Sequence, residues 1–174
     1  MPRHTPGRLR LDDFLPYRLS VVSNVISHAI STAYAERFNL SIPEWRVVAV
    51  LAMQPDLSAA QVAERTAMDK VAVSRAVTAL LAADRIERQF ASTDQRRSVL
   101  RLSKGGKAVY AQVVPVALAY EHTLLAPISA RDRGTLDRIL RLLLGRAREI
   151  GPAGAPGRPC TRPHTKPHAG QRSA

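Results

Sequence analysis

Helix-start signals recur along the middle of the chain, and they constrain the fold more than any other feature. Ser41 is followed by isoleucine, proline and glutamate, a capping box with proline in the first helical turn. Ser58 and Ser129 begin stretches of the same kind, and two more residues, Asp69 and Ser103, can cap the segments after them. These five caps predict five helices.

Two stretches also carry apolar residues at helical spacing. The segment before Ser41 does so, which predicts a sixth helix, with the stripe Val22, Val25, Ile26, Ala29, Ile30 and Ala33. The segment after Ser129 forms a second stripe, made of Leu136, Ile139, Leu140, Leu143 and Leu144.

The stretch between the fourth and fifth caps has a different period. Residues 97–102 alternate, with Leu100 and Leu102 facing one way and Val99 and Arg101 the other. Residues 86–90 are a second short strand candidate, and residues 91–95 are typical of a turn, so we expect a β-hairpin. The predicted fold is mainly α with a small β-hairpin wing: a winged helix-turn-helix lobe within an α-helical frame.

The two ends of the chain differ from its middle. From Gly151 onward, glycine, proline and arginine recur without a period, and such a segment cannot bury enough apolar surface to fold. We therefore expect a flexible basic arm over residues 1–10, one folded domain over residues 11–148 and a disordered basic tail over residues 149–174.

The formal net charge of +12 suits a polyanionic partner, although a soluble basic protein would also show it. Cys160 is the one cysteine, so an intrachain disulfide is excluded, which fits a reducing cytoplasm. No apolar run approaches the ~20 residues of a membrane span. We expect a cytoplasmic protein without a membrane partner.

Residues 59–66 and 70–82 predict two short helices with the spacing of a helix-turn-helix. On the second helix, one stripe is apolar, with Val73, Val77, Leu80 and Leu81. The opposite face carries Lys70, Ser74, Arg75 and Thr78, whose polar groups can meet base edges and phosphates in the major groove. An ordinary amphipathic helix with a solvated face would show the same pattern, so this helix alone leaves both interpretations open.

The predicted wing turn carries Asp94, Arg96 and Arg97. An arginine on a narrow ribbon can enter the minor groove, whose negative potential favours it. Asp94 can orient that guanidinium through a paired contact. The alternative is a loop salt bridge of little energetic weight.

These residues carry a family resemblance. Residues 94–106 (DQRRSVLRLSKGG) resemble the wing signature of the MarR, or multiple-antibiotic-resistance regulator, family. Residues 73–77 and 86–88 resemble that family's recognition helix and its exit into the wing, and residues 15–19 and 42–46 resemble its opening helices. The similarity covers residues 11–144.

The resemblance implies a two-fold dimer, with dimerisation helices over residues 11–40 and 104–148 around a DNA-binding lobe over residues 42–103. It implies contacts from Ser74 and Arg75 in the major groove and from Arg96 in the minor groove of a pseudo-palindromic operator.

The chain departs from the family pattern at two neighbouring positions. Asp84 stands where the family usually has glycine, and aspartate tolerates the left-handed conformation. Arg85 replaces a commonly apolar residue, which puts the local packing in question.

The family also implies a small aromatic or phenolic effector, bound between the dimer helices and the DNA-binding lobe, that releases a repressor from DNA. Candidate contacts are polar residues of the first helix and the start of the second: Asn24, Ser27, His28, Ser31, Trp45 and Arg46. A carboxylate could pair with Arg46 or His28 while its ring stacks on Trp45. Core packing is the simpler interpretation for each residue taken singly.

Other functional classes find less support in the sequence. No nucleophile motif, zinc-protease motif or Walker pattern is present, so we expect neither an enzyme nor a bound cofactor. His28 and His122 lack a third metal ligand, and prolines break the helix that would align His164 with His168. The remaining alternative is a non-specific architectural DNA-binding or RNA-binding basic protein, which would leave the wing motif unexplained.

Overall fold

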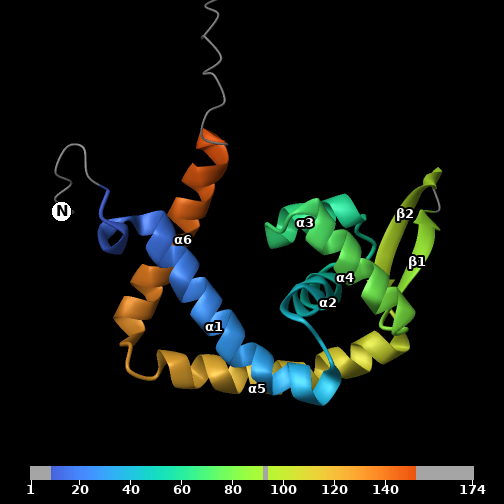
Figure 1. Ribbon diagram of the computed structural model, residues 1–174, viewed down its shortest axis with the longest axis horizontal. Helices are drawn as coiled ribbons and strands as arrows, with labels where there is room; N and C mark the ends of the chain where they lie inside the picture. Colours follow the sequence, from blue (N-terminus) through green and yellow to red (C-terminus); the bar gives the residue numbers. More distant parts are fainter. Residues whose placement is uncertain (1–8, 92–93, 152–174) are drawn as a thin grey trace, which may run out of the picture. The chain divides into compact units, whose positions relative to one another are not determined.

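The computed structural model describes residues 9–91 and 94–151 (Figure 1). Its described part contains a short 3-10 helix, six α-helices and one antiparallel pair of strands, in the order η1 Leu11–Asp13, α1 Leu15–Phe38, α2 Ile42–Met53, α3 Ala59–Thr66, α4 Lys70–Ala82, β1 Ile86–Ala91, β2 Asp94–Leu102, α5 Lys104–Leu125 and α6 Ala130–Ile150. The predicted mainly α fold with a hairpin wing is confirmed. The described residues up to Ala126 form one compact unit, and those from Pro127 form a second.

The five predicted caps all start helices. Ser41 and Ser58 form complete capping boxes, because the side chains of Glu44 and Gln61 accept hydrogen bonds from the cap residues' backbone. Ser129 caps α6 without completing the predicted box. The carboxylate of Asp132 accepts from the Ser129 hydroxyl at 2.7 Å instead. Aspartate is one methylene shorter than the glutamate or glutamine of a capping box.

A single apolar core joins the C-terminal part of α1 to α2, α3, α4, the hairpin and α5. Its largest fully buried side chains are Tyr34, Leu40, Leu51, Leu57, Leu80, Ile86 and Leu100. The predicted stripe of α4 lies in this core, with Val73, Val77 and Leu80 buried and Leu81 packed against them. Burying each such side chain stabilises the fold by about 1.5–3 kcal/mol. This core fixes the position of α4.

The N-terminal half of α1 and the whole of α6 differ from that core. Val22 and Val25, in the predicted first-helix stripe, are 55% and 62% exposed. No residue of α6 is buried, although its stripe is present as predicted. Figure 1 shows the C-terminal end of α1 beside α5, while the N-terminal half of α1 extends away from α2, α3 and α4. Most of the apolar side chains in these two stripes are exposed in the described part of the chain.

The wing is the β1–β2 hairpin, paired from Ile86 opposite Leu102. Leu100 and Leu102 are buried while Val99 and Arg101 are half-buried, as the alternation predicts. The strands are longer than predicted. β1 includes Ala91 and β2 begins at Asp94, so the backbone at residues 91, 94 and 95 belongs to strands instead of the predicted turn. Antiparallel pairing extends the ladder past the point where the alternating apolar pattern stops.

The connection from α4 to the wing explains both departures from the family pattern. Asp84 adopts the left-handed conformation that was expected of it, with φ of 51°. The Arg85 guanidinium donates to the backbone oxygens of Phe38 and Asn39, at the C-terminal end of α1. Helix ends leave carbonyl oxygens without an intrahelical partner, and a cation satisfies them well. Arg85 therefore binds α1 to the lobe.

Three further observations concern the ends and the helix lengths. α6 continues to Ile150, so the helix outlasts the predicted end of the folded domain by two residues. Residues 1–8 and 152–174, including Cys160, His164 and His168, lie outside the described residues. Within the described part, no single helix is both long and apolar enough to cross a membrane.

Candidate nucleic-acid interface

The turn between α3 and α4 fixes where the candidate recognition helix begins. Ala67 ends α3 in the left-handed conformation, with φ of 52°. The Thr66 hydroxyl donates to the Val62 carbonyl at 2.7 Å, which satisfies an acceptor at that helix end. Asp69 then accepts from the Ala72 amide at 2.8 Å and starts α4. The predicted bounds of both helices, 59–66 and 70–82, are confirmed.

The outer face of α4 carries the four residues that the sequence singles out, namely Lys70, Ser74, Arg75 and Thr78, and all four are exposed. Among the described residues, neither Lys70 nor Arg75 has a carboxylate within ion-pair distance. Thr78 donates its hydroxyl to the Ser74 carbonyl at 3.0 Å. The face is therefore cationic and is not neutralised from within the described chain.

Two shallow grooves flank α4 and divide this set. Lys70, Ser74 and Thr78 line a groove of about 270 Å³ that also contacts α3 and β1. Arg75 lines the other groove, of about 340 Å³, beside the start of α2. Glu44 lines that second groove too, but its carboxylate accepts from Ser41. The structure thus places Arg75 on a different side of the helix from the other three residues.

Two residues of this surface were missed by sequence reasoning. Val71 is 58% exposed in the first turn of α4, one helical turn before Arg75. An apolar residue on an otherwise polar helix face was the available signal. Arg88 of β1 lines the groove that contains Lys70 and adds a second cation there. Only the fold brings that strand beside α4.

The wing residues predicted to contact DNA are Asp94, Arg96 and Arg97. Their backbone belongs to β2. Their side chains lie outside the described part of the structure.

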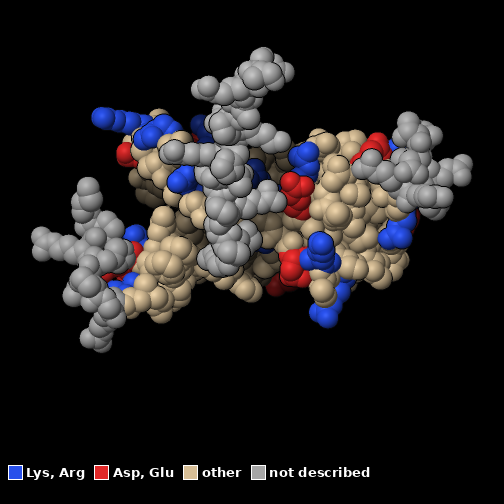
Figure 2. All heavy atoms as spheres, turned by 90° about the horizontal axis from the view of Figure 1, so that it is seen from above, with Lys and Arg blue, Asp and Glu red and all other residues tan. Residues whose placement is uncertain are grey.

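Figure 2 shows Lys and Arg distributed over the face in view, with acidic groups among them, instead of gathered in one patch. Net charge alone therefore does not single out α4 as the DNA-binding surface. The helix-turn-helix geometry does.

The predicted effector residues are only partly brought together. Arg46 donates to the Ser27 hydroxyl at 3.3 Å, which joins α2 to α1. The Ser31 hydroxyl donates to the His28 carbonyl at 2.8 Å. Asn24 and His28 are exposed, whereas Ser27, Ser31 and Arg46 are half-buried. The contact between α1 and α2 therefore centres on Ser27 and Arg46.

Trp45 lies between two tyrosines. Its ring centroid is 5.7 Å from that of Tyr34 and 5.9 Å from that of Tyr110. Burial raises the pKa of the Tyr34 phenol above its ordinary value, and the Arg46 charge partly offsets that rise. The indole is thus already packed against aromatic rings, and a ligand ring has only the remaining part of its surface to contact.

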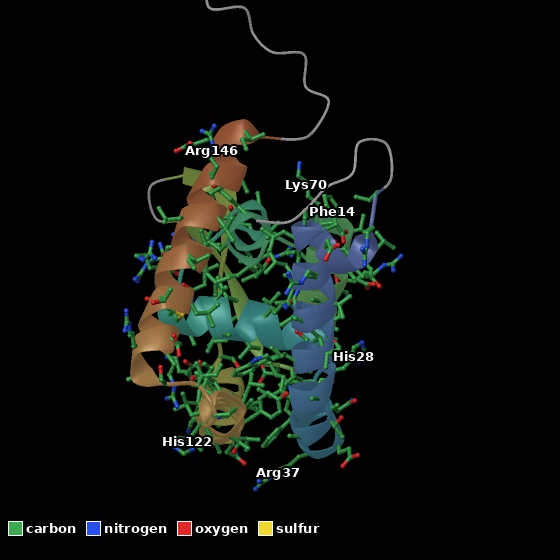
Figure 3. All side chains as sticks on the ribbon, turned by 90° about the vertical axis from the view of Figure 1, so that its left-hand side faces the viewer. Phe14, His28, Arg37, Lys70, His122 and Arg146 are labelled. Atoms are coloured by element: carbon green, nitrogen blue, oxygen red, sulfur yellow. The ribbon has the colours of Figure 1, made fainter. Side chains whose placement is uncertain are left out.

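His28 and His122 lie on separate helices, α1 and α5 (Figure 3). Across residues 9–91 and 94–151, no three side chains of the metal-ligating types come together.

Comparison with known proteins agrees with this geometry. The family model described as MarR family matches residues 38–97, a range that runs from the end of α1 into β2. A MarR/EmrR family transcriptional regulator from Acinetobacter sp. ADP1 superposes with a TM-score of 0.75 at 26% identity, covering 81% of this chain and 99% of its own. No curated protein matches the sequence.

Two further solved structures are similar. A probable transcriptional regulator from Pseudomonas aeruginosa has a TM-score of 0.64 at 26% identity, over 77% of this chain and 99% of its own. The PcaV regulator from Streptomyces coelicolor, solved with its natural ligand, shares the fold at 19% identity and a TM-score of 0.67, over 80% of this chain and 97% of its own. With the helix-turn-helix and wing described above, these matches show that the chain has the fold of the winged helix-turn-helix transcriptional regulators of the MarR family, which are not enzymes.

Proposed function

We propose that this chain is a cytoplasmic repressor that binds a pseudo-palindromic operator as a homodimer and is released by a small aromatic or phenolic ligand. The observation that carries the proposal is the outer face of α4. It presents Lys70 and Arg75 without carboxylate partners in the described chain, on a helix held by a rigid core. A supported helix with free donors suits insertion into the major groove of B-DNA.

The two sides of α4 would contribute differently to recognition. Arg75 would donate to a guanine edge, while Lys70 and Arg88, which line the opposite groove, suit backbone phosphates. Ser74 can donate to either kind of acceptor. The apolar side chain of Val71 and the methyl group of Thr78 suit contact with thymine methyl groups. Arg96, oriented by Asp94 and supported by Arg97, would enter the minor groove.

Dimerisation is supported by the uncovered apolar side chains of the frame. Val22, Val25, Leu136, Leu140 and Leu144 are between 42% and 62% exposed. Exposed apolar residues at helical spacing, on each of these two long helices, are typical of a surface that a protein partner covers. A second copy of the chain would bury them and place two α4 helices for two half-sites.

The effector proposal rests on the contact between α1 and α2. Arg46 and Ser27 supply donors for a carboxylate or phenolate beside the aromatic cluster of Trp45. Asn24, His28 and Ser31 lie along the same helix, within reach of a second copy packed on α1. The PcaV structure holds a natural ligand, which supports a small-molecule effector in a protein of this fold.

The test is equilibrium DNA binding by wild type and Arg75→Ala, on a duplex recovered by selection and on a random duplex. Loss of a bidentate base contact should cost about 1–3 kcal/mol on the selected duplex and much less on the random one. Arg131→Ala, an exposed arginine of α6, is the matched control and should change neither affinity.

An equal loss on both duplexes would make Arg75 a phosphate contact. If wild type itself preferred neither duplex, the protein would be a non-specific architectural or RNA-binding protein, and the proposal would be wrong.

A further inference from the structure

Two connections join the winged lobe to the long helices beside it. The first is residues 39–41, between α1 and α2, and the second is Ser103, between β2 and α5. The elements between these connections, from α2 to β2, pack around one apolar core. A change in the angle between the lobe and α1 or α5 must therefore occur at these two places.

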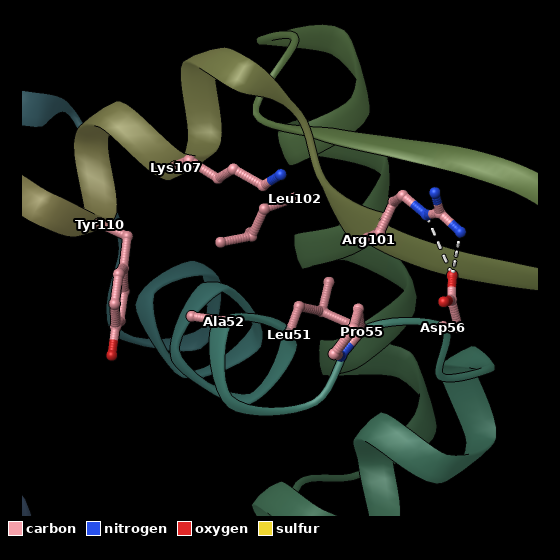
Figure 4. Close-up of a pocket in the computed structure, with 8 residues that line it drawn as sticks. All are labelled: Leu51, Ala52, Pro55, Asp56, Arg101, Leu102, Lys107 and Tyr110. Carbon is pink, nitrogen blue, oxygen red and sulfur yellow. Dashed lines mark hydrogen bonds and ion pairs between the residues drawn. The ribbon is translucent and has the colours of Figure 1, made fainter.

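The wing belongs to the lobe, so it moves with α4. Arg101 donates from Nε and Nη2 to one oxygen of Asp56, at 3.0 and 2.7 Å (Figure 4). The Asp56 amide donates to the Leu100 oxygen at 3.0 Å, and the Leu100 amide donates to the Leu57 oxygen at 2.8 Å. These bonds hold β2 against the segment between α2 and α3. The lobe is therefore one body as far as the second connection.

The second connection is held by backbone groups of Asp84 and Arg85, which follow α4. The Ser103 amide donates to the Arg85 oxygen at 3.1 Å, and the Ser103 hydroxyl donates to the Asp84 oxygen at 2.6 Å. Gly106 of α5 lies so close to the Arg85 oxygen that a side chain would not fit there. Because these contacts use the backbone, a residue other than arginine at position 85 could make them too.

The first connection depends on the Arg85 side chain instead. Its guanidinium donates to the backbone oxygens of Phe38 and Asn39. Asn39 ends α1 in the left-handed conformation, with φ of 47°. The C-terminal end of a helix carries a partial negative charge, which strengthens hydrogen bonds from a cation. Among the described residues, Arg85 has no carboxylate within ion-pair distance, so its charge meets this helix end.

The other contacts between α1 and the lobe constrain the angle less. Tyr34 and Leu40 pack into the lobe core, and apolar contacts have no preferred direction. Arg46 donates one hydrogen bond to the Ser27 hydroxyl in the middle of α1, where the helix end contributes no charge. Arg85 supplies two donors at the point where the chain turns into the lobe. An apolar residue, which the MarR pattern commonly has at this position, could not donate.

We infer that Arg85 sets the half-site spacing that this repressor accepts, because it fixes the angle between α1 and the lobe. The inference rests on the dimer proposed above, in which α1 lies at the interface and α4 in the DNA. A change of angle at Asn39 would then move each α4 relative to the other. Each base pair added between two half-sites moves them about 3.4 Å apart and rotates them by about 35°. A dimer with a fixed angle cannot follow such a change without losing contacts.

The experiment measures equilibrium binding by full-length wild type and Arg85→Ala to duplexes that carry the selected inverted half-sites. Their spacing is kept as selected or changed by a single base pair. Wild type should lose about tenfold in affinity on that change, whereas Arg85→Ala should lose less than about threefold. Arg85→Lys keeps a cation at the helix end and should recover part of the discrimination. A merely stabilising role of Arg85 would leave the spacing preference unchanged, and that result would overturn the inference.

Arg37→Ala is the matched control, because Arg37 is a second cation in the last turn of α1. Its guanidinium lies 5.4 Å from the centroid of the Phe38 ring and makes no hydrogen bond to the lobe among the described residues. The variant should keep the wild-type spacing preference. If it lost that preference as Arg85→Ala does, the charge of the helix end would set the spacing, and the inference would be wrong. If wild type bound no inverted half-sites at all, the proposed function itself would be wrong.

Distances between the two lobes of a dimer test the same inference without DNA. In a Cys160→Ser background, Ala82→Cys provides one site for a spin label in each copy, at the exposed end of α4. The distribution of label-to-label distances should be narrow when Arg85 is present, and broader or shifted in Arg85→Ala. Equal distributions would overturn the inference, even if the variant bound DNA poorly.

Discussion

The winged lobe and helix α6 differ in how far they bury their large apolar side chains. The lobe buries Leu51, Leu80 and Leu100 almost completely within one chain. Helix α6 buries none of its residues, although it also carries an apolar stripe in the sequence. The lobe is therefore stabilised by its own core, whereas α6 needs a surface that this chain does not supply within its described residues.

This difference separates two tasks. A DNA-binding helix must be held in a fixed position, and side chains locked by packing achieve that. Every inner residue of α4, from Val73 to Leu80, contacts the lobe core. A dimerisation helix gains from keeping its apolar stripe free for a partner. An apolar stripe thus predicts burial, but not whether that burial occurs within one chain or between two.

The largest expected effect comes from a cavity in the lobe. Leu80→Ala should lower the free energy of unfolding by about 2–5 kcal/mol. Leu80 is 1% exposed, and removal of its methyl groups leaves a cavity in the core. Thermal or urea unfolding measures the loss.

The matched change in α6 is Leu140→Ala, at a position 44% exposed. It should raise the dimer dissociation constant in sedimentation, while Leu80→Ala leaves that constant unchanged in the folded protein. If Leu140→Ala had no effect on dimerisation, the role given to the α6 stripe would be wrong.

Two glycines, one at the start of α5 and one in α6, differ in the same way in how closely they are packed. A Cβ at Gly106, at the start of α5, would lie 1.8 Å from the backbone oxygen of Arg85, whereas a Cβ at Gly145 of α6 would meet nothing within 4 Å. Alanine normally stabilises a helix interior by about 1 kcal/mol relative to glycine. Gly106→Ala should instead destabilise by about 1–3 kcal/mol or more, because the backbone must move.

Gly145→Ala should raise the stability by up to about 1 kcal/mol. Unfolding of both variants at one protein concentration is the measurement. A stabilised Gly106→Ala would show that α5 does not pack closely on the wing connection.

The smallest effect concerns the turn of the helix-turn-helix. Ala67 occupies the left-handed conformation at φ of 52°, which costs an L-residue other than glycine roughly 1–2 kcal/mol. Ala67→Gly should therefore stabilise the lobe by about 1 kcal/mol without altering DNA affinity. Ala126→Gly, at a right-handed helix end, is the control and should not stabilise. A destabilised Ala67→Gly would contradict the left-handed turn.

Much of the lobe could be predicted from the sequence because its signals are local. Ser41, Ser58 and Asp69 each accept a hydrogen bond from a backbone amide three residues further along the chain. Such caps can therefore be recognised directly in the sequence. The alternation that ends at Leu102 likewise indicated the second strand of the wing. The outer face of α4 could be assigned from the same helical period as its buried stripe.

The parts that could not be predicted depend on contacts between distant segments. Arg85 is 46 residues from Asn39 and 47 from Phe38, so no local pattern predicts its hydrogen bonds to the end of α1. Arg101 and Asp56 are 45 residues apart, so no local pattern predicts their ion pair either. The two grooves beside α4 depend on where β1 and α2 lie. For the same reason, the position of Arg88 beside α4 could not be predicted.

A dimer should place two α4 helices on DNA, and selection from a random duplex pool by the full-length protein measures this. We expect enrichment of two inverted half-sites, with centres about one helical turn, or roughly 10 base pairs, apart. Arg75→Ala should lose preference at matching positions in both halves. Recovery of unenriched duplexes, or of one asymmetric site without inverted repeats, would contradict the account.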